Sequence, residues 1–574
     1  MSHSPPATAV TGDSHASLGQ QRSRSITGSE WLACAIIVVG LVALRIHFVS
    51  QAGGMWRDEA HSVDVARDDR FPAWQDSFPI LWIQFLRVWI SVWGSSDDSG
   101  LRSAGLFCGL LMLGSALWAA QGRGRTIPWA TLILFGLSPV AVTYGSEVRG
   151  YALGVATQLW MLGALQRFLL RPTGWGGLHL TLASLIAVQA AFPNSFLLLA
   201  GSLSAGILCV RERRWKSFLV FAANGILAAA TVSPYILVLL PRLTGDWVVV
   251  VRQEFPITWY LMQMKYAFSA GGPLPLAAWI LLGLGTTWAV QTGLFQSPES
   301  QPSTVTVRSG KPGAFEFMLL GFGTVLILAY LKWLKVPTFD WYYLPLMGLF
   351  AFCFDSVMAT WTFTPRASLT KLGIALFLGA VQIPSAWSAA NLRMTNVDLA
   401  GQAVTSVATQ NDLVVVIPWY FGIPLQRYYH GPAPWICLPR VTQTEVPGIV
   451  IHADGYRAVK AAMMRNNSLE AELAQVRETL QRGDRVFVLG LFVPSRPGDA
   501  MIELPPAPHS RYGWSETAYE TQWRQQLGIE LRNHSTQIEE HPLENRQVIH
   551  MHEHCQLFVA TGRAVTAPQA VPTP

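Results

Sequence analysis

The sequence predicts an all-α polytopic membrane domain of about 11 transmembrane helices, followed by a C-terminal extracytoplasmic α/β domain. Only 13% of the 574 residues are charged and 51% are hydrophobic, whereas a soluble domain carries about 25% charged residues. The apolar residues form runs of about 15–20, long enough to cross a hydrocarbon core. After residue 390 the composition becomes mixed and charged. These observations exclude an ordinary soluble enzyme, a disordered chain and a disulfide-built secreted domain.

The N-terminal residues 1–30 are polar and rich in Ser, Thr, Gly and Pro, so we expect a disordered cytoplasmic tail. The first apolar run, 31–50, starts too late for a signal peptide and is the first expected span. The other expected spans are 103–120, 127–144, 151–170, 178–193, 195–210, 217–240, 274–294, 314–334, 342–358 and 372–390. Pro193 separates two of these spans, and it could instead kink a single long helix.

Lys and Arg concentrate in alternate connections, including the run of Arg211, Arg213, Arg214 and Lys216. Because positive loops stay in the cytoplasm, this asymmetry predicts an N-terminus inside and a C-terminus outside. The assignment requires that residues 78–93 do not span the membrane. That segment contains Gln84, Arg87 and three Trp, and we interpret it as a helix lying in the membrane interface.

Residues 391–574 contain two strand-like runs, Leu413–Ile417 and 485–491, on either side of an amphipathic helix. The helix has a start signal at Asn467, with Glu470 three residues later, and a stop signal at Gly483. Strand, helix and strand predict a small α/β unit. Cys437 and Cys555 both lie in it, and the sequence leaves open whether they pair.

Three polar clusters lie at span ends on the predicted outer side: residues 55–61, 145–151 and 332–343. Arg102 enters the second span from the same face. Ionisable residues at such positions are functional candidates. A carboxylate can take a proton from an attacking hydroxyl, and cations can stabilise a departing phosphate. The clusters therefore predict chemistry on a lipid-linked phosphate.

Each of these residues also has a purely structural interpretation. Asp58 could be a helix N-cap, with Glu59 favoured by the helix dipole in the first turn. Arg149 and Lys335 could be interfacial residues that extend towards water. Arg102 could be a structural partner for a nearby carboxylate.

The order of these motifs resembles the GT-C superfamily of membrane glycosyltransferases. A span is followed by Trp56-Arg57-Asp58-Glu59-Ala60, then by an apolar amphipathic segment ending in Trp93-Gly94, then by Arg102 at the opening of the next span. Residues 145–153 are similar to the family's E-x-R-x-Y-A-L stretch. The pattern resembles bacterial protein O-mannosyltransferases, lipid A aminoarabinose transferases and rhizobial core-sugar transferases. The resemblance covers about the first 390 residues.

The resemblance implies a sugar donor on a polyprenyl phosphate, transfer on the outer face of the membrane, and inversion at the anomeric carbon. It implies that Asp58 is the general base and that Glu59 is its catalytic neighbour. The family's later Arg-Tyr appears here as Tyr342-Tyr343, so a lysine would supply the missing charge. The expected donor-phosphate contacts are Arg102, Arg149, Lys332 and Lys335. The expected further substrate contacts are Arg57, Glu147, Tyr151 and Tyr343.

The predicted organisation is a transferase domain over 31–390, with the active site in the first outer loop, 51–102, and a separate α/β domain over 391–574. The partners implied are the donor, the bilayer, and a lipid, polysaccharide or protein acceptor, in a bacterial inner or plasma membrane. No nucleic acid is expected, because the basic residues act as orientation signals. No cofactor and no metal ligand is assigned, although a divalent metal is one option. The alternatives are a membrane transporter and an inactive relative that binds glycans or assembles envelope proteins.

Overall fold

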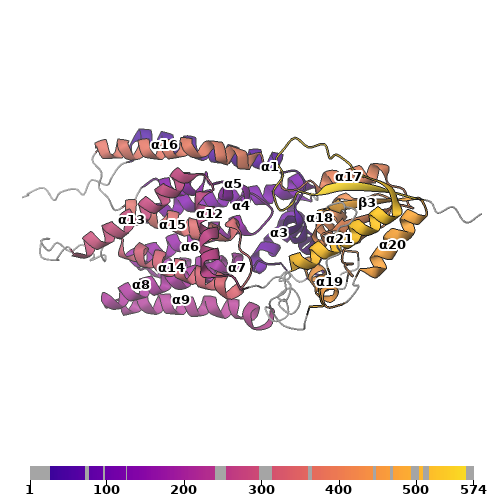
Figure 1. The fold of residues 1–574 in the computed structure, drawn as a ribbon. Helices are drawn as coiled ribbons and strands as arrows, with labels where there is room; N and C mark the ends of the chain where they lie inside the picture. Colours follow the sequence, from indigo (N-terminus) through magenta and orange to yellow (C-terminus); the bar gives the residue numbers. More distant parts are fainter. Residues whose placement is uncertain are drawn as a thin grey trace, which may run out of the picture.

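The computed structural model describes residues 26–71, 76–94, 97–123, 126–239, 254–295, 313–359, 365–443, 448–465, 469–492, 503–507 and 516–563. Figure 1 shows a bundle of helices at one end of the molecule and an α/β region at the other. The helix α2 (Arg57–Arg67) and the amphipathic helix α3 (Ile80–Trp93) lie between α1 and α4 in the chain. The predicted tail falls almost wholly outside the described residues.

The bundle is built from apolar helices that follow the expected spans closely. Its elements are α1 (Gly28–Gln51), α4 (Asp98–Ala120), η2 (Gln121–Arg123), η3 (Ala130–Phe135), α5 (Pro139–Thr143), α6 (Tyr151–Leu170), α7 (Gly174–Ala190), α8 (Pro193–Arg211), α9 (Trp215–Pro234), η4 (Tyr235–Leu239), α12 (Ile257–Ser269), α13 (Pro273–Phe295), α14 (Ala314–Leu334), η6 (Asp340–Tyr343), α15 (Leu344–Met358) and α16 (Pro365–Ala390). Helix α16 packs along α1 at one edge of the bundle (Figure 1).

Seven described helices are long and apolar enough to cross a membrane, or eight if one bent pair counts as a single span. The bent pair is α12 and α13, with a bend of 109° between the two helices. The chain is therefore a helical membrane protein, but the expected count of 11 spans is not confirmed. Helix α6 and the 17-residue α7 form where expected, yet neither is among the seven.

The expected span over 127–144 is wrong as a single helix. The segment is a π-helical turn, η3, followed by the short α5, with Pro139 at the first position of α5. A proline in a helix interior removes a backbone hydrogen bond and clashes with the preceding turn. The backbone N–H groups of Ala130 and Thr131 donate to the buried Asp355 carboxylate of α15, each at 2.9 Å. These bonds satisfy the first backbone N–H groups of η3 inside the bundle.

Arginines 213 and 214 lie at the end of α6 opposite its first residue, Tyr151. The Arg214 guanidinium donates to the carbonyl oxygen of Leu169, near the end of α6, at 2.7 Å. The side-chain amide of Asn194 instead donates to the carbonyl oxygen of Gly154, near the start of α6, at 2.9 Å. The two clusters that the sequence assigns to opposite membrane faces therefore lie at opposite ends of one helix.

The α/β region contains a five-stranded sheet in the order β2-β1-β3-β5-β4. Its strands are β1 (Leu413–Ile417), β2 (Trp435–Cys437), β3 (Arg485–Gly490), β4 (Ser535–Glu540) and β5 (Gln556–Gly562). Its helices are α17 (Val397–Val407), η7 (Trp419–Phe421), α18 (Gly422–Tyr428), α19 (His452–Met463), α20 (Glu470–Gln481) and α21 (Glu516–His534). The strands β2, β1 and β3 are parallel, and β5 is antiparallel to β3 and β4.

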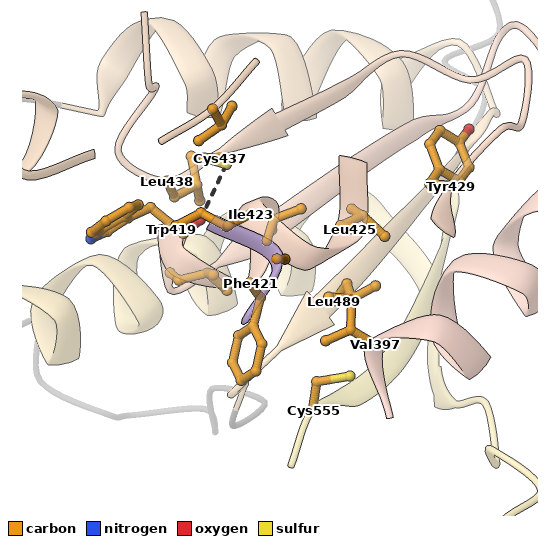
Figure 2. Packing of buried hydrophobic residues seen from close by; sticks show 14 of the residues in the cluster. Val397, Trp419, Phe421, Ile423, Leu425, Tyr429, Cys437, Leu438, Leu489 and Cys555 are labelled. Carbon is orange, nitrogen blue, oxygen red and sulfur yellow. Dashed lines mark hydrogen bonds between the residues drawn. The ribbon is translucent and has the colours of Figure 1, made fainter. Parts of the chain in front are cut away.

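The predicted strand–helix–strand unit is present as β1, α20 and β3, and the two strands are parallel neighbours. The predicted helix start at Asn467 lies outside the described residues. Figure 2 shows the apolar packing around β1 and β3, with Cys437 and Cys555 both buried and free. The Cys437 thiol donates to the carbonyl oxygen of Trp419 at 3.5 Å, so the disulfide that the sequence left open is not formed.

The α/β region shares its hydrophobic core with the segment between α1 and α4. One buried cluster runs from Met55 and Trp82 in that segment to Val397 and the sheet strands. A backbone bridge also joins Gly53 to Thr395. Helices α2 and α18 are in contact. This packing fixes the start of α2 against the α/β region.

Candidate functional site

The candidate site is built around the first turn of α2. Trp56 is the N-cap residue, and its side chain is buried. The interpretation of Asp58 as the N-cap is therefore wrong, because Asp58 is the second residue of the helix. The indole N–H of Trp56 donates to Oε2 of Glu147 at 3.0 Å. Asp58 and Glu59 follow in the first helical turn, where the helix dipole stabilises negative charge. Successive helix positions point about 100° apart, so the two carboxylates face different surroundings.

Glu59 is an interior residue. Its side chain is 0% exposed and forms a two-pronged ion pair with Arg102, which is 2% exposed. The two guanidinium–carboxylate distances are 2.9 and 3.0 Å, and the backbone N–H of Val148 also donates to Glu59 at 2.8 Å. The pair links α2, α4 and the loop before α6. Arg102 therefore contacts a nearby carboxylate, as in its purely structural interpretation. The side chains of Glu59 and Arg102 do not reach a surface where a substrate could bind.

Asp58 is the partly exposed carboxylate of this turn, with 23% of its side chain accessible. Its Oδ2 lies 3.6 Å from Arg149 Nη2, and its Oδ1 lies 3.2 Å from Nε2 of His452 in α19. Burial raises the pKa of Asp58, but Arg149, the His452 hydrogen bond and Arg57 together lower this pKa well below its ordinary value. Asp58 is therefore ionised and placed between cations.

Arg149 is buried and is held by a set of oxygen atoms. It donates to Ser62 Oγ at 2.7 Å, to Ser77 Oγ at 2.7 Å and to Asp76 Oδ2 at 3.2 Å. Burial lowers the pKa of Arg149, but Asp76 and Asp58 raise it above its usual value, so the guanidinium is permanently charged. Its orientation is fixed before any substrate arrives.

The loop that carries Arg149 is held by contacts to α1 and α4. Buried Arg45 of α1 donates to the carbonyl oxygen of Gly145 and to Ser146 Oγ, each at 2.8 Å. A Cβ atom at Gly105 of α4 would overlap the backbone carbonyls of this loop. Arg45 interrupts an apolar span, and this was the signal in the sequence that could have identified it.

Arg57 lies on the side of Asp58 that faces the α/β region. Its Nε is 3.2 Å from Oε1 of the fully buried Glu553, and its guanidinium stacks over the Tyr420 ring at 4.3 Å. Burial raises the pKa of Glu553 to about 8, although Arg57 opposes this shift. Burial lowers the pKa of Arg57, but Glu553, Tyr420 and Asp58 raise it above its usual value, so the guanidinium is charged.

Glu147 and two histidines lie beside these charges. Burial and the neighbouring Glu59 raise the pKa of Glu147 well above its ordinary value. His550 accepts or donates a hydrogen bond with Tyr144 at 2.8 Å, and burial lowers the pKa of His550 to about 4. Burial and His452 lower the pKa of His61 to about 3. Both histidines are therefore uncharged near neutral pH and add no positive charge beside Asp58.

The third predicted cluster contributes a different tyrosine from the one expected. Tyr343 is buried and donates to the carbonyl oxygen of Tyr260 at 2.8 Å, so it is a core residue. Its neighbour Tyr342 instead lies within electrostatic range of Asp58, Arg149 and Arg57. Adjacent residues in a helical turn point in different directions. The sequence did not show which of the two tyrosines lies near Asp58.

Lys332 and Lys335 lie at the end of α14 and contact another part of the chain. Lys332 Nζ donates to the carbonyl oxygen of Phe255 at 2.5 Å, and Lys335 Nζ pairs with Glu254 at 2.7 Å. These contacts join both lysines to the segment at residues 254–255. Tyr151, in contrast, packs edge-on against Phe78, the ring beside the Arg149 guanidinium. The cluster thus contains Arg57, Asp58, Glu147, Arg149 and Tyr151 among the expected residues.

No group of three or more His, Cys, Asp or Glu side chains in the described ranges is arranged to hold a metal ion. A polar cavity of about 500 Å³ lies farther along α2, next to Asp64, Arg67, Asp98, Gln426 and Arg427. Asp64 follows Asp58 by six residues, about 9 Å along a helix. This cavity is therefore separate from the charged cluster.

The comparisons with known proteins give distant likenesses among solved structures. No protein-family model matches the sequence, and no curated protein matches it. Among the solved structures, an oligosaccharyltransferase of Archaeoglobus fulgidus, crystallised with zinc and sulfate, is similar with a TM-score of 0.46. The two chains are 12% identical, and the match covers 79% of this chain and 67% of that one. At that level the likeness does not identify a function, and the proposal below rests on the site itself.

Proposed function

We propose that the protein is a membrane glycosyltransferase of the GT-C type, which moves a sugar from a polyprenyl-phosphate donor to an acceptor hydroxyl on the outer face of the membrane. The observation that carries the proposal is the position of Asp58. It is an ionised, partly exposed carboxylate beside Arg149 and Arg57, where the apolar helices meet the α/β region. Asp58 is the first acidic residue of the W-x-D-E-A motif, which resembles that of the family.

In this proposal Asp58 is the general base and acts in an inverting displacement. The acceptor O–H transfers its proton to Asp58 while the acceptor oxygen bonds to the anomeric carbon. The bond between that carbon and the phosphate oxygen breaks, and its electron pair leaves with the phosphate. A base is needed because a hydroxyl is a poor nucleophile until its proton is accepted. Arg149 and Arg57 stabilise the negative charge on the leaving group.

The low pKa of Asp58 suits a base that is activated by the donor. A carboxylate with a strongly lowered pKa is a weak base, and the cause here is the pair of arginines together with His452. A donor phosphate that binds Arg149 and Arg57 compensates their charge, which raises the pKa of Asp58. Proton abstraction is then favoured only when the donor is in place.

Glu59 and Arg102 take a positioning role in this proposal, in place of the catalytic and phosphate-binding roles that the sequence suggested. Their ion pair sets the first turn of α2 against α4. The donor phosphate is assigned to Arg149 and Arg57, because Lys332 and Lys335 contact residues 254–255 instead. Tyr151 and Tyr342 are the half-buried polar groups available to the sugar, whereas Glu147 is fully buried.

The transporter and the inactive relative remain the alternatives. Asp355 is a buried acid in α15, the kind of residue that marks ion pathways. Its carboxylate accepts from Ala130 and Thr131, so its contacts are those of a helix cap. An inactive relative would not need the ionised, accessible carboxylate that Asp58 provides.

The direct test uses membranes that contain the protein and a panel of polyprenyl-phosphate sugars with labelled hexoses and pentoses. We expect label to move from at least one donor to a membrane lipid, polysaccharide or protein, and that donor identifies the sugar. Membranes with Asp69→Asn, an exposed acid just after α2, are the matched control and should be as active as wild type. Absence of transfer from every donor in the panel would contradict the proposal.

A further inference from the structure

His452 belongs to the α/β region but contacts the segment between α1 and α4. It is the first residue of α19, and Asp58 is the second residue of α2. Its Nε2 lies 3.2 Å from Oδ1 of Asp58. Two helix N-termini from distant parts of the chain therefore converge on one hydrogen bond.

The imidazole ring is held on several sides. The ring of His61 meets it edge-on at 4.6 Å, Trp419 meets it edge-on at 6.1 Å, and Tyr456 stacks beside it at 6.0 Å. Its Nδ1 is buried, with no hydrogen-bond partner among the described residues. Because an ionised carboxylate can only accept, Nε2 carries the hydrogen and donates to Asp58. The contacts thus fix both the tautomer and the direction of this donor.

We propose that His452 is a positioning residue for Asp58, and that the α/β region thereby completes the catalytic site. The inference rests on the proposed function. The donor at Nε2 holds Oδ1 of Asp58, which leaves Oδ2, beside Arg149, to receive the proton of the acceptor hydroxyl. Without His452 the carboxylate can turn towards Arg149 or Arg57 and lose its alignment with the acceptor.

Several other groups face Asp58 and must be considered in any titration experiment. From α2 and the loop before α6 they are Arg57, His61, Glu147 and Arg149. From η6, α6, α19 and the loop before β5 they are Tyr342, Tyr151, Tyr456 and Glu553. A change at His452 removes none of these groups, but His452→Ala also takes away the ring against which His61 and Tyr456 pack. The comparison of His452→Ala with His452→Gln, which keeps an N–H donor, therefore reports the hydrogen bond to Asp58.

The first test measures protonation of Asp58 without using activity. A water-soluble carbodiimide reacts with the protonated carboxyl group, so the labelling rate at fixed pH follows the protonated fraction. We compare the full-length protein with His452→Ala and His452→Gln, and quantify Asp58 by peptide mass spectrometry against the exposed Glu540. Loss of a hydrogen bond to a charged acceptor corresponds to about one to two pKa units, so His452→Ala should label about 10–100-fold faster.

The second test measures sugar transfer. We expect His452→Ala to lower kcat by up to about 100-fold while the KM for the donor changes little, because the base is misaligned and the phosphate contacts remain. His452→Gln retains an N–H donor at a similar reach, so it should recover most of kcat and show labelling close to wild type. The exposed His430 on the same region provides the control, and His430→Ala should match wild type in both measurements.

Equal labelling of Asp58 in wild type and His452→Ala would overturn the inference, as would a kcat in His452→Ala equal to that of wild type. If His452→Gln is as impaired as His452→Ala, the N–H donor is not what matters and the inference is also wrong. Failure of the wild-type protein to transfer sugar would instead refute the proposed function. In that case the labelling comparison still decides whether His452 holds Asp58.

Discussion

The replacement Glu59→Gln should damage the fold rather than the chemical step. Glu59 is fully buried, and its ion pair with Arg102 is enclosed on both sides. Glutamine retains one acceptor oxygen but removes the charge and places an NH₂ group against guanidinium donors. Breaking one partner of a buried pair costs about 3–5 kcal/mol, because the other charge is left uncompensated. We therefore expect a large loss of stability in Glu59→Gln.

The assay is the fraction of monodisperse protein that survives heating in detergent, measured by size-exclusion chromatography over a range of temperatures. Asp58→Asn, at the neighbouring position, should stay within about 1 kcal/mol of wild type, because the ion pair of Asp58 with Arg149 is partly exposed and Arg149 keeps Asp76 as a partner. The double variant Glu59→Met with Arg102→Met removes both charges. It should recover much of the stability that Glu59→Gln loses, since an apolar replacement of a whole buried pair is often neutral.

The contrary outcome would be a Glu59→Gln protein that is as stable as wild type and has lost sugar transfer. That result would mean that Glu59 acts on the substrate, as the sequence first suggested. A double variant less stable than Glu59→Gln would show that the pair itself contributes net stability. Either result would refute the assignment of Glu59 and Arg102 to the interior framework of the site.

Two further predictions concern Arg149 and Glu553. Arg149→Ala should weaken donor use by about 10²–10³-fold and Arg149→Lys should restore only part of it, because lysine lacks the two-pronged guanidinium; wild-type donor affinity and turnover in Arg149→Ala would remove it from the site. Glu553 has a pKa raised to about 8, so the folded state binds its proton more tightly than the unfolded state, and Glu553 lowers stability progressively as the pH rises from about 4.5 to 8. In thermal unfolding at successive pH values, Glu553→Gln should therefore gain stability relative to wild type over that range and level off above it; a difference that does not change with pH would contradict this.

The sequence predicted a helical membrane protein because composition and hydropathy are averaged over many residues and do not depend on the details of packing. Long apolar runs fix the membrane helices, and α1, α4 and α14 lie within a few residues of their expected positions. The strand-like apolar runs likewise located β1 and β3. The failure at 127–144 has a local cause, because hydropathy does not register the helix break before Pro139.

The candidate site was predicted in its residue types more than in its geometry. The W-x-D-E-A motif identified Asp58 and Glu59 together, but only the packing of α2 shows that one is buried and the other accessible. His452 and Glu553 lie almost 400 and 500 residues from Asp58 along the chain. Contacts over such separations depend on the tertiary fold, and no local pattern in the sequence indicates them.

The central claim is that Asp58 accepts a proton during sugar transfer, and the most direct test is the rate of transfer by purified Asp58→Asn relative to wild type. Asparagine keeps the size and an acceptor for His452, but it cannot take the proton. Loss of a general base typically costs about 10²–10⁴-fold in rate, equivalent to about 2.7–5.4 kcal/mol. We predict a fall of that size at unchanged thermal stability, with Asp69→Asn as active as wild type. A stable Asp58→Asn protein with full activity would contradict the account and leave Asp58 as a structural residue in the first turn of α2.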